Sequence, residues 1–346
     1  MPAFQSPSVP AGQTCVSENR TCTNGTLSGT YQYSSCTPLV AGPTPVKVLT
    51  YNVRKGLDFQ TQATLGKIAD FIAAERPDVV ALQELAQNGN SGFNNLTTLL
   101  SLLAARGYPM NGVFATRFFQ TNQMLGQAVL SKNTITDYVE YRPNYQGYGL
   151  DQATLSAVNG KDVIQTFRTQ VGGTTFRFFN PHPQPSVGCV MSDVLRNYTA
   201  GFTGDVQVIA GDFNTLDNGG CAYMQTLKQS FASACKEHLA KKPADKSCEY
   251  SVDRTVWEGG IYAPPDLGEA VDHVLVRRTN ATSLPWTVNS AKTNLAMNQG
   301  LAISDHLPVV ATFTTAPSTS FAGKRSYVAA AFEAVKALLA RLHIGW

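Results

Sequence analysis

An aspartate and an asparagine two residues apart follow an apolar segment near the middle of the chain. That segment, residues 206–210, predicts a buried strand, and Gly211 ends it in a turn. On extended backbone, Asp212 and Asn214 point the same way. A carboxylate accepts hydrogen bonds and a carboxamide also donates them, so the pair suits a site that holds a water and a phosphate. A capped turn is the alternative interpretation, because Asp and Asn are ordinary turn residues.

Polar residues that can do chemistry also stand at the ends of other predicted strands. They are Asn52, Glu84, His182, Asp272, Asp305 and His306. Unrelated surface residues would instead be scattered over loops and helix faces. Clustering at strand ends is what a site on one rim of a sheet requires. We therefore expect these side chains to converge in the folded chain.

These residue types suit metal-assisted hydrolysis. Glu84 and Asn52 offer hard oxygen ligands, which together with phosphate oxygens and waters suit Mg²⁺. Asp272 and His306 can form a couple in which the carboxylate fixes the imidazole tautomer and the ring takes a proton from water. His182 can stabilise or protonate a leaving oxygen. A single histidine is more often structural, and it is their joint occurrence that favours catalysis.

Strand and helix patterns alternate from residue 46 onward, which indicates an α/β fold. The predicted strands are 46–51, 79–82, 128–131, 163–169, 175–179, 206–210, 271–276 and 308–313. The predicted helices are 65–74, 93–106, 193–202, 224–233 and 326–343.

Six short motifs occur in the order typical of the endonuclease/exonuclease/phosphatase superfamily. They are Leu49–Val53 (LTYNV), Leu82–Glu84 (LQE), Asn180–His182 (NPH), Gly211–Asn214 (GDFN), Val271–Asp272 (VD) and Ser304–Pro308 (SDHLP). The chain resembles that superfamily from about residue 46 to residue 313. The resemblance implies a four-layer α/β sandwich of two packed, mostly antiparallel sheets flanked by helices. It also implies hydrolysis of a phosphoester by in-line attack of water, assisted by Mg²⁺, with Mn²⁺ or Ca²⁺ as alternatives.

The resemblance also implies a role for each matching residue. The catalytic positions are matched by His182, Asp212, Asp272 and His306. Substrate contacts are expected from Asn52, Asn214 and Arg54, and metal contacts from Glu84, Asn52 and Asp305. Two positions depart from the pattern. Pro181 and Pro183 flank His182, and His273 stands where an aromatic is common, so we interpret His273 as structural.

The motifs indicate the reaction more sharply than the substrate. A net charge of +3 is too small to indicate a polyanionic partner, although a local patch can still steer one. Candidate rim residues for tracking a nucleic-acid strand are Arg54, Lys55, Arg117, Arg142, Tyr141, Tyr145 and Tyr148. We expect a nuclease acting on DNA or RNA. The alternatives are a sphingomyelinase-type phospholipase C, a phosphomonoesterase and a non-catalytic surface-binding protein.

The seven cysteines favour disulfides over a metal site, because none forms a C-x-x-C pair. Disulfides place the chain in an oxidising compartment. The four cysteines after residue 180 allow three pairings, and a Cys221–Cys248 bond would clamp the loop after Asp212. The segment 22–36 is interpreted as a small hairpin stapled by its two cysteines. The third cysteine near the N-terminus is left as a free thiol, or its partner lies upstream.

Composition changes divide the chain into three parts. Residues 1–45 form a cysteine-bearing arm and linker, 46–314 the catalytic domain, and 315–346 a linker and a basic amphipathic helix. That helix is expected to dock on the domain or to pair subunits, with contact to a membrane surface as the alternative. No signal peptide or membrane span is predicted. We expect a secreted or cell-surface protein, from a bacterium, whose oligomeric state the sequence leaves open.

Overall fold

The computed structural model separates into two compact units, Thr44–Thr315 and a smaller one made of Met1–Pro43 and Ala316–Trp346. It describes residues 1–9, 13–38, 45–54, 62–87, 94–120, 123–216, 220–245, 247–248, 251, 270–278, 286–293, 304 and 306–315. Lys55, Asp305 and the predicted helix 326–343 lie outside these residues. The three-part division by sequence therefore stays a prediction.

The larger unit contains two six-stranded sheets and six α-helices among its described residues. The strands are β7 (Pro45–Asn52), β8 (Val79–Gln87), β9 (Asn111–Gln120), β10 (Gln123–Ser131), β11 (Thr136–Tyr141), β12 (Ile164–Val171), β13 (Thr174–Pro181), β14 (Val206–Asp212), β15 (Phe231–Ser233), β16 (Asp272–Arg277), β17 (Trp286–Thr293) and β18 (Val309–Thr315). The helices are α1 (Gln62–Glu75), α2 (Asn95–Ala105), α3 (Gln152–Val158), α4 (Gly188–Ala200), α5 (Ala222–Ser230) and α6 (Ala234–Lys241), with a short 3₁₀ turn at Pro185–Val187.

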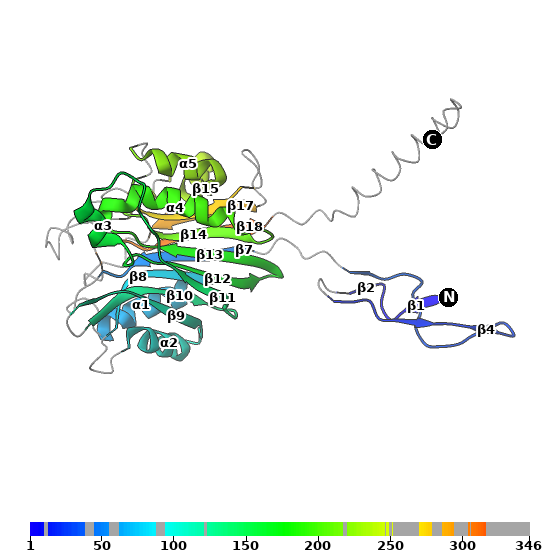
Figure 1. The fold of residues 1–346 in the computed structure, drawn as a ribbon. Helices are drawn as coiled ribbons and strands as arrows, with labels where there is room; N and C mark the ends of the chain where they lie inside the picture. The colour runs from blue at the N-terminus through cyan, green and yellow to red at the C-terminus, as the bar shows by residue number, and fades with distance from the viewer. Residues whose placement is uncertain are drawn as a thin grey trace, which may run out of the picture. The chain divides into compact units, whose positions relative to one another are not determined.

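The two sheets have matching designs. One has the order β17-β18-β7-β8-β10-β9 and the other β11-β12-β13-β14-β16-β15. In each sheet the two central strands, β7 with β8 and β13 with β14, run parallel, whereas all other neighbours are antiparallel. Helices α1 and α2 lie outside the first sheet, and α4 and α5 outside the second (Figure 1). The predicted four-layer α/β sandwich of mostly antiparallel sheets is confirmed.

Three apolar clusters hold these layers together. Alternate residues of β7 serve two of them: Val46 and Val48 pack between the sheets, whereas Leu49 and Tyr51 pack under α1 and α2. The third cluster lies between the second sheet and the helices α4 and α5. Burying each such side chain stabilises the fold by roughly 1.5–3 kcal/mol relative to its exposure. Burial on both faces explains why these strands read as continuous apolar segments.

Every predicted strand, and every predicted helix within the described residues, coincides at least in part with an observed element. The helix predicted over 224–233 is wrong in its last turn, because α5 ends at Ser230 and residues 231–233 form β15. Phe231 and Ala232 enter different apolar clusters, which is the alternation of a strand. In the larger unit, the strands and α-helices missed by the sequence analysis are β9, β11, β15, β17, α3 and α6.

The disulfides differ from the pairing considered above. The bonds are Cys15–Cys36, Cys189–Cys221 and Cys235–Cys248. Cys221 is the N-cap residue of α5 and bonds to the first turn of α4, so the Cys221–Cys248 pairing is wrong. The clamp on the loop after Asp212 nevertheless exists, with α4 as its anchor. Three disulfides indicate an extracytoplasmic location.

The N-terminal arm consists of short strands. They are β1 (Pro2–Phe4), β2 (Ser8–Val9), β3 (Ser17–Asn19), β4 (Cys22–Thr23), β5 (Thr26–Leu27) and β6 (Thr37–Pro38). A hairpin does form at β4 and β5, around Asn24-Gly25 in the left-handed conformation that a tight two-residue turn needs. The expected Cys22–Cys36 staple is wrong, because Cys36 bonds Cys15 and Cys22 is an exposed free thiol. Within the described residues, no helix is long and apolar enough to cross a membrane.

Candidate active site

The central parallel strands bring the predicted residues to one edge of the sandwich. Parallel neighbours end at the same edge, so Asn52 at the end of β7 lies beside Gln83 of β8. In the second sheet, Asp212 ends β14 and His182 directly follows β13. The antiparallel strand β16 begins at this edge, where Asp272 pairs with Asp212.

A continuous set of contacts joins these side chains across both sheets. The carboxylate of Asp212 lies at the centre: its Oδ2 accepts a 2.9 Å hydrogen bond from Asn52 Nδ2. The same oxygen is 3.6 Å from Nε2 of His182 and 3.8 Å from Nε2 of His306. Glu84 Oε1 closes the set, at 3.6 Å from His182 Nε2 and 3.4 Å from Asn52 Nδ2. The expected convergence of Glu84 and His306 in one cluster is therefore observed.

His306 is held from both ends. Its Nδ1 lies 2.8 Å from Oδ2 of Asp272. Its backbone N–H donates to the hydroxyl of Ser304, which in turn donates to the carbonyl of Asn52. A second buried serine, Ser251, accepts the backbone N–H of Asp272. Ser304 opens the SDHLP motif but was given no role of its own, and Ser251 was not singled out, because a serine that only positions backbone has no chemical signature in the sequence.

The electrostatics of the site are dominated by buried carboxylates. Burial raises the pKa of Asp212 to about 6, and the neighbouring Asp272 carboxylate adds to the rise. Hydrogen bonds from Asn52 and from the backbone N–H of Asn214 act in the opposite direction. The Oδ1 atom of Asp272 is buried and has no hydrogen-bond partner among the described residues. Burial and the adjacent carboxylate thus outweigh the neighbours that favour the charged form of Asp212.

Glu84 reaches the site through a β-bulge. In the pairing of β8 with β10, Leu82 opposes Ala128 and Leu85 opposes Gly126, so Gln83 and Glu84 together face one residue. Glu84 adopts φ +56°, in the left-handed region that residues other than glycine rarely occupy. The extra residue turns the carboxylate of Glu84 toward Asn52 and His182.

Two more site residues share this rare conformation. Arg54 has φ +45° and Asn214 has φ +48°. The backbone N–H of Arg54 donates to Asn52 Oδ1, and the side chain of Asn214 donates to the carbonyl of Pro183. Such conformations cost of order 1 kcal/mol each and persist where the surroundings impose them. They are typical of functional sites, which agrees with the substrate contacts expected here.

Close backbone packing holds the Asp212–Asn214 turn in place. A Cβ added to Gly211 would lie 2.3 Å from the carbonyl oxygen of Pro181, which precedes His182. A Cβ on Gly188, at the start of α4, would lie 2.5 Å from the carbonyl oxygens of Phe213 and Asn214. Both positions therefore require glycine. The tight packing explains how two prolines are accommodated around His182, because the loop is braced by its neighbours.

Several residues expected at a nucleic-acid rim lie elsewhere. Arg117 and Tyr145 are wrong as rim residues: both are buried and contact the carboxylate of Asp162. Tyr141 stacks on Tyr198 with the ring centroids 4.1 Å apart. Arg142 and Tyr148 are compatible with a rim, whereas Lys55 lies outside the described residues. Arg142 is exposed, and Tyr148 packs edge-on against the exposed ring of Tyr223.

His273 lies beside the turn without entering the contact set. Its ring is buried, packs edge-on against Phe213, and places Nε2 3.2 Å from the carbonyl of Thr215. These contacts agree with the structural interpretation made from the sequence.

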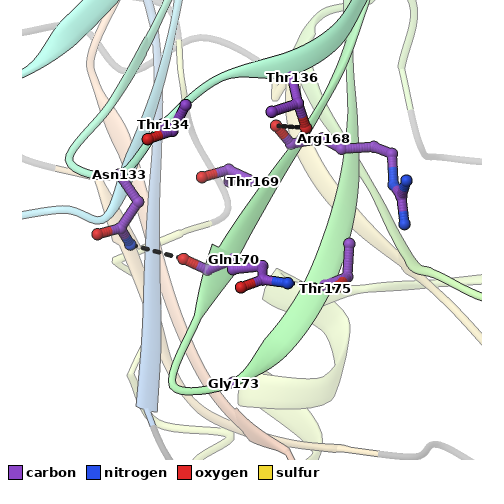
Figure 2. A pocket seen from close by; sticks show the side chains of 8 residues that line it. All are labelled: Asn133, Thr134, Thr136, Arg168, Thr169, Gln170, Gly173 and Thr175. Atoms are coloured by element: carbon purple, nitrogen blue, oxygen red, sulfur yellow. Dashed lines mark hydrogen bonds between the residues drawn. The ribbon is translucent and has the colours of Figure 1, made fainter.

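A polar hollow of about 460 Å³ lies at the opposite end of β13 from His182. Figure 2 shows its lining around the Gly172–Gly173 turn: Asn133, Thr134, Thr136, Arg168, Thr169, Gln170, Gly173 and Thr175. The guanidinium of Arg168 already pairs with the carboxylates of Asp137 and Asp205. Its charge is therefore neutralised, and we do not place the reaction here.

Comparison with known proteins identifies the family. A model described as the Endonuclease/Exonuclease/phosphatase family matches residues 49–306, well over half of the chain, and takes in the first five motifs and the sixth as far as His306. The chain belongs to the endonuclease/exonuclease/phosphatase family. A comparison with curated proteins found no match.

Solved structures of endonuclease/exonuclease/phosphatase proteins share the fold. A family member from Leptotrichia buccalis is 19% identical with a TM-score of 0.57, over 77% of this chain and 98% of that one. A protein from Beutenbergia cavernae is 20% identical with a TM-score of 0.56, over 79% and 72%. TDP2 from D. rerio, complexed with a single-strand DNA product, is 16% identical with a TM-score of 0.54, over 78% and 99%. At these identities the likeness concerns the fold alone.

Members of this family typically use a divalent metal, and the residues present fit one. Glu84 and Asn52 supply hard oxygen atoms, and the carboxylate of Glu84 is 22% exposed, so an ion can reach it. The ligand atoms of Asp212, Asp272 and His306 also lie within 4.8 Å of one another. The raised pKa of Asp212 and the unpartnered Oδ1 of Asp272 both indicate a site that a cation would stabilise.

Proposed function

We propose that this chain is an exported bacterial phosphodiesterase that depends on Mg²⁺ and cleaves nucleic acid. The observation that carries the proposal is the contact set around Asp212, which unites residues from β7, β8, β14 and the segments after β13 and before β18. No local structural need accounts for two histidines and three acids in one buried edge. Hydrolysis of a phosphoester by water needs this combination of ligands, base and hydrogen-bond donors.

In this proposal Glu84 and Asn52 hold the metal beside the scissile phosphate. When bound there, Mg²⁺ supplies positive charge that polarises the phosphate and offsets the charge developing on it. We assign the same role to Asp305, which lies outside the described residues. The chain itself contributes the positions of the two ligands: the β-bulge in β8 fixes Glu84, and the end of β7 fixes Asn52.

The water would be activated by His306. The carboxylate of Asp272 accepts the Nδ1–H of His306, so that Nε2 keeps a lone pair for a proton. Nε2 faces Asp212 at 3.8 Å, too far for a direct hydrogen bond, and one water placed beside the two atoms can contact both. Asp212 then orients the water and His306 takes its proton.

On the side of the phosphate opposite the water, His182 and Asn214 are proposed to contact the leaving oxygen and a phosphate oxygen. Nε2 of His182 lies 3.6 Å from the same Asp212 oxygen that His306 faces, but it comes from the end of β13 rather than from the segment before β18. In this proposal the leaving oxygen stands beside His182, in line with the attacking water. One N–H of the Asn214 carboxamide donates to the Pro183 carbonyl, which orients the amide and keeps its second N–H for a phosphate oxygen.

Nucleic acid is favoured as the substrate by two observations. Arg142 is an exposed cation that pairs at 3.4 Å with a single partly exposed carboxylate among the described residues, Glu140, and Tyr148 and Tyr223 add a half-buried and an exposed aromatic ring of the kind that stacks on bases. The structurally similar D. rerio TDP2 is a complex with a single-strand DNA product.

A substrate panel tests the proposal directly. Purified protein is incubated with plasmid DNA, RNA, sphingomyelin and bis-p-nitrophenyl phosphate, with Mg²⁺ or with EDTA. We expect cleavage of DNA or RNA that EDTA abolishes. Cleavage of sphingomyelin alone would make the chain a phospholipase C, and inactivity on every substrate with Mg²⁺ would indicate a binding protein instead.

Replacing Glu84 with glutamine is expected to raise the Mg²⁺ concentration for half-maximal rate by about tenfold or more, because a neutral amide replaces the charged ligand. Mg²⁺ titrations of initial rate measure the effect, and calorimetry of Mg²⁺ binding measures it without substrate. Glu237→Gln is the matched control, since Glu237 pairs with Arg278 on the surface. Identical titrations for Glu84→Gln and wild type would remove Glu84 from the metal site.

A further inference from the structure

Arg117 makes a direct contact with the imidazole of His182 from behind the site. It lies on β9, and only 6% of its side chain is exposed. Its Nε and Nη2 atoms donate to Asp162 Oδ1 at 3.1 and 2.9 Å. Its remaining terminal nitrogen, Nη1, lies 3.1 Å from Nδ1 of His182. The guanidinium therefore bridges a buried carboxylate and one ring nitrogen of a proposed catalytic residue.

The carboxylate of Asp162 is itself fixed. It is fully buried, and its second oxygen accepts the hydroxyl of Tyr145 at 2.8 Å and the backbone N–H of Gln184 at 3.3 Å. Both oxygens are thus occupied. Because Asp162 also neutralises Arg117, the arginine can remain buried next to the site at low electrostatic cost.

This geometry dictates the tautomer of His182. A guanidinium has only donors and does not lose its proton in proteins, so Nδ1 of His182 must accept the hydrogen bond. A neutral imidazole with an accepting Nδ1 carries its proton on Nε2. That Nε2–H points to Glu84 and Asp212, each 3.6 Å away.

His306 is held in the opposite way. Its Nδ1 faces the Asp272 carboxylate, which only accepts, so the proton sits on Nδ1 and Nε2 is the acceptor. Two histidines therefore face the same Asp212 oxygen with opposite hydrogen-bonding character. The residue behind each ring differs accordingly, an arginine for His182 and an aspartate for His306.

We propose that Arg117 is a positioning residue that holds His182 as a neutral Nε2–H donor, so that only His306 can serve as the base. The assignment of a donor to the leaving side rests on the proposed function, whereas the tautomer itself does not. Arg117 also explains why a cation stands in the core at this point. An uncharged apolar residue would leave Asp162 without its cation and both tautomers of His182 accessible.

Nitrogen-15 spectra of the histidine rings test the tautomer without any substrate. The full chain has five histidines, so a His182→Gln variant identifies the signals of His182 by their loss. Spectra are recorded in EDTA at about pH 8, where an ordinary histidine with a pKa of ~6.5 is neutral. We expect a protonated Nε2 and an unprotonated Nδ1 for His182, and the reverse for His306. A protonated Nδ1 on wild-type His182 would overturn the proposal, whatever the variants do.

Variants at Arg117 test whether this residue determines the tautomer of His182. Arg117→Met removes the donor, and we expect His182 to populate both tautomers and kcat to fall about tenfold or more with little change in KM. Arg117→Lys keeps a donor and should restore most of the Nε2–H signal. Arg168→Met is the matched control, because Arg168 also pairs with aspartates but lies away from the site. A wild-type tautomer in Arg117→Met would overturn the role of Arg117.

The two proposals fail in different ways. A chain that cleaves no phosphoester would contradict the proposed function, yet its ring spectra would still decide the tautomer. Conversely, an active nuclease whose His182 carries its proton on Nδ1 would keep its function and lose the role given to Arg117.

Discussion

Replacing His306 with alanine is expected to lower kcat at least about 100-fold, with a much smaller change in KM. General bases contribute about 10²- to 10⁴-fold, and 100-fold corresponds to about 2.7 kcal/mol of transition-state stabilisation. The ring is held in its proposed working orientation by the 2.8 Å contact with Asp272 and by the Ser304 hydroxyl. Nothing else among the described residues places an accepting imidazole nitrogen beside Asp212.

The chain provides a matched control for this substitution. His238 on α6 is equally buried and pairs with Asp245 at 3.0 Å, but it is not part of the contact set around Asp212. His238→Ala should therefore keep kcat within a few-fold of wild type at a temperature where it is folded. Single-turnover rates on the best substrate of the panel measure both variants. Wild-type turnover in His306→Ala would refute its assignment as the base.

Replacing Asn180 with leucine is expected to lower the free energy of unfolding by about 3 kcal/mol or more. Its side chain accepts from Gln83 at 2.8 Å and donates to Gln165 at 2.9 Å, and its carbonyl accepts from Gln127 at 2.8 Å. All four residues are fully or almost fully buried. Leucine has the same number and branching of heavy atoms but would leave at least two buried polar groups without partners, each costing about 1–3 kcal/mol.

The location of Asn180 makes this substitution informative. Gln83 and Gln127 belong to the first sheet and Asn180 and Gln165 to the second, so the network fixes one sheet against the other beside the site. Urea unfolding measures the loss. Asn111→Leu is the control, since Asn111 is exposed on β9 and should change the free energy by no more than about 0.5 kcal/mol. Equal stabilities for the two variants would show that the network does not brace the sheets.

The sequence predicted that the site lies at strand ends on one edge of a sheet, because the ends of strands can be located from the local pattern of apolar residues. Apolar segments of strand length end at Asn52, Asp212 and the residues before His182, and parallel central strands bring such ends together. The six motifs then indicated the layer architecture through resemblance. Most of the individual contacts follow from these two facts, since residues at neighbouring strand ends lie within a few ångströms of each other.

What the sequence could not predict depends on partners far along the chain. Arg117 looked like a surface cation, and only the position of Asp162, 45 residues later, draws it into the core. The disulfides follow the same logic, because Cys189 meets Cys221 through the packing of α4 on α5 rather than through any spacing. A signal was present for Arg117: it lies at even offsets from Val113, which packs against the cluster between the sheets, and from the buried Ala115. Without the position of β9 in the sheet, the sequence does not tell which face of the strand is buried.

The left-handed backbone at Arg54, Glu84 and Asn214 sets local stability against side-chain chemistry. Glycine would occupy each of the three positions with less conformational penalty. Replacing any of them by glycine would therefore relieve the backbone while removing the guanidinium, carboxylate or carboxamide that the proposed function requires.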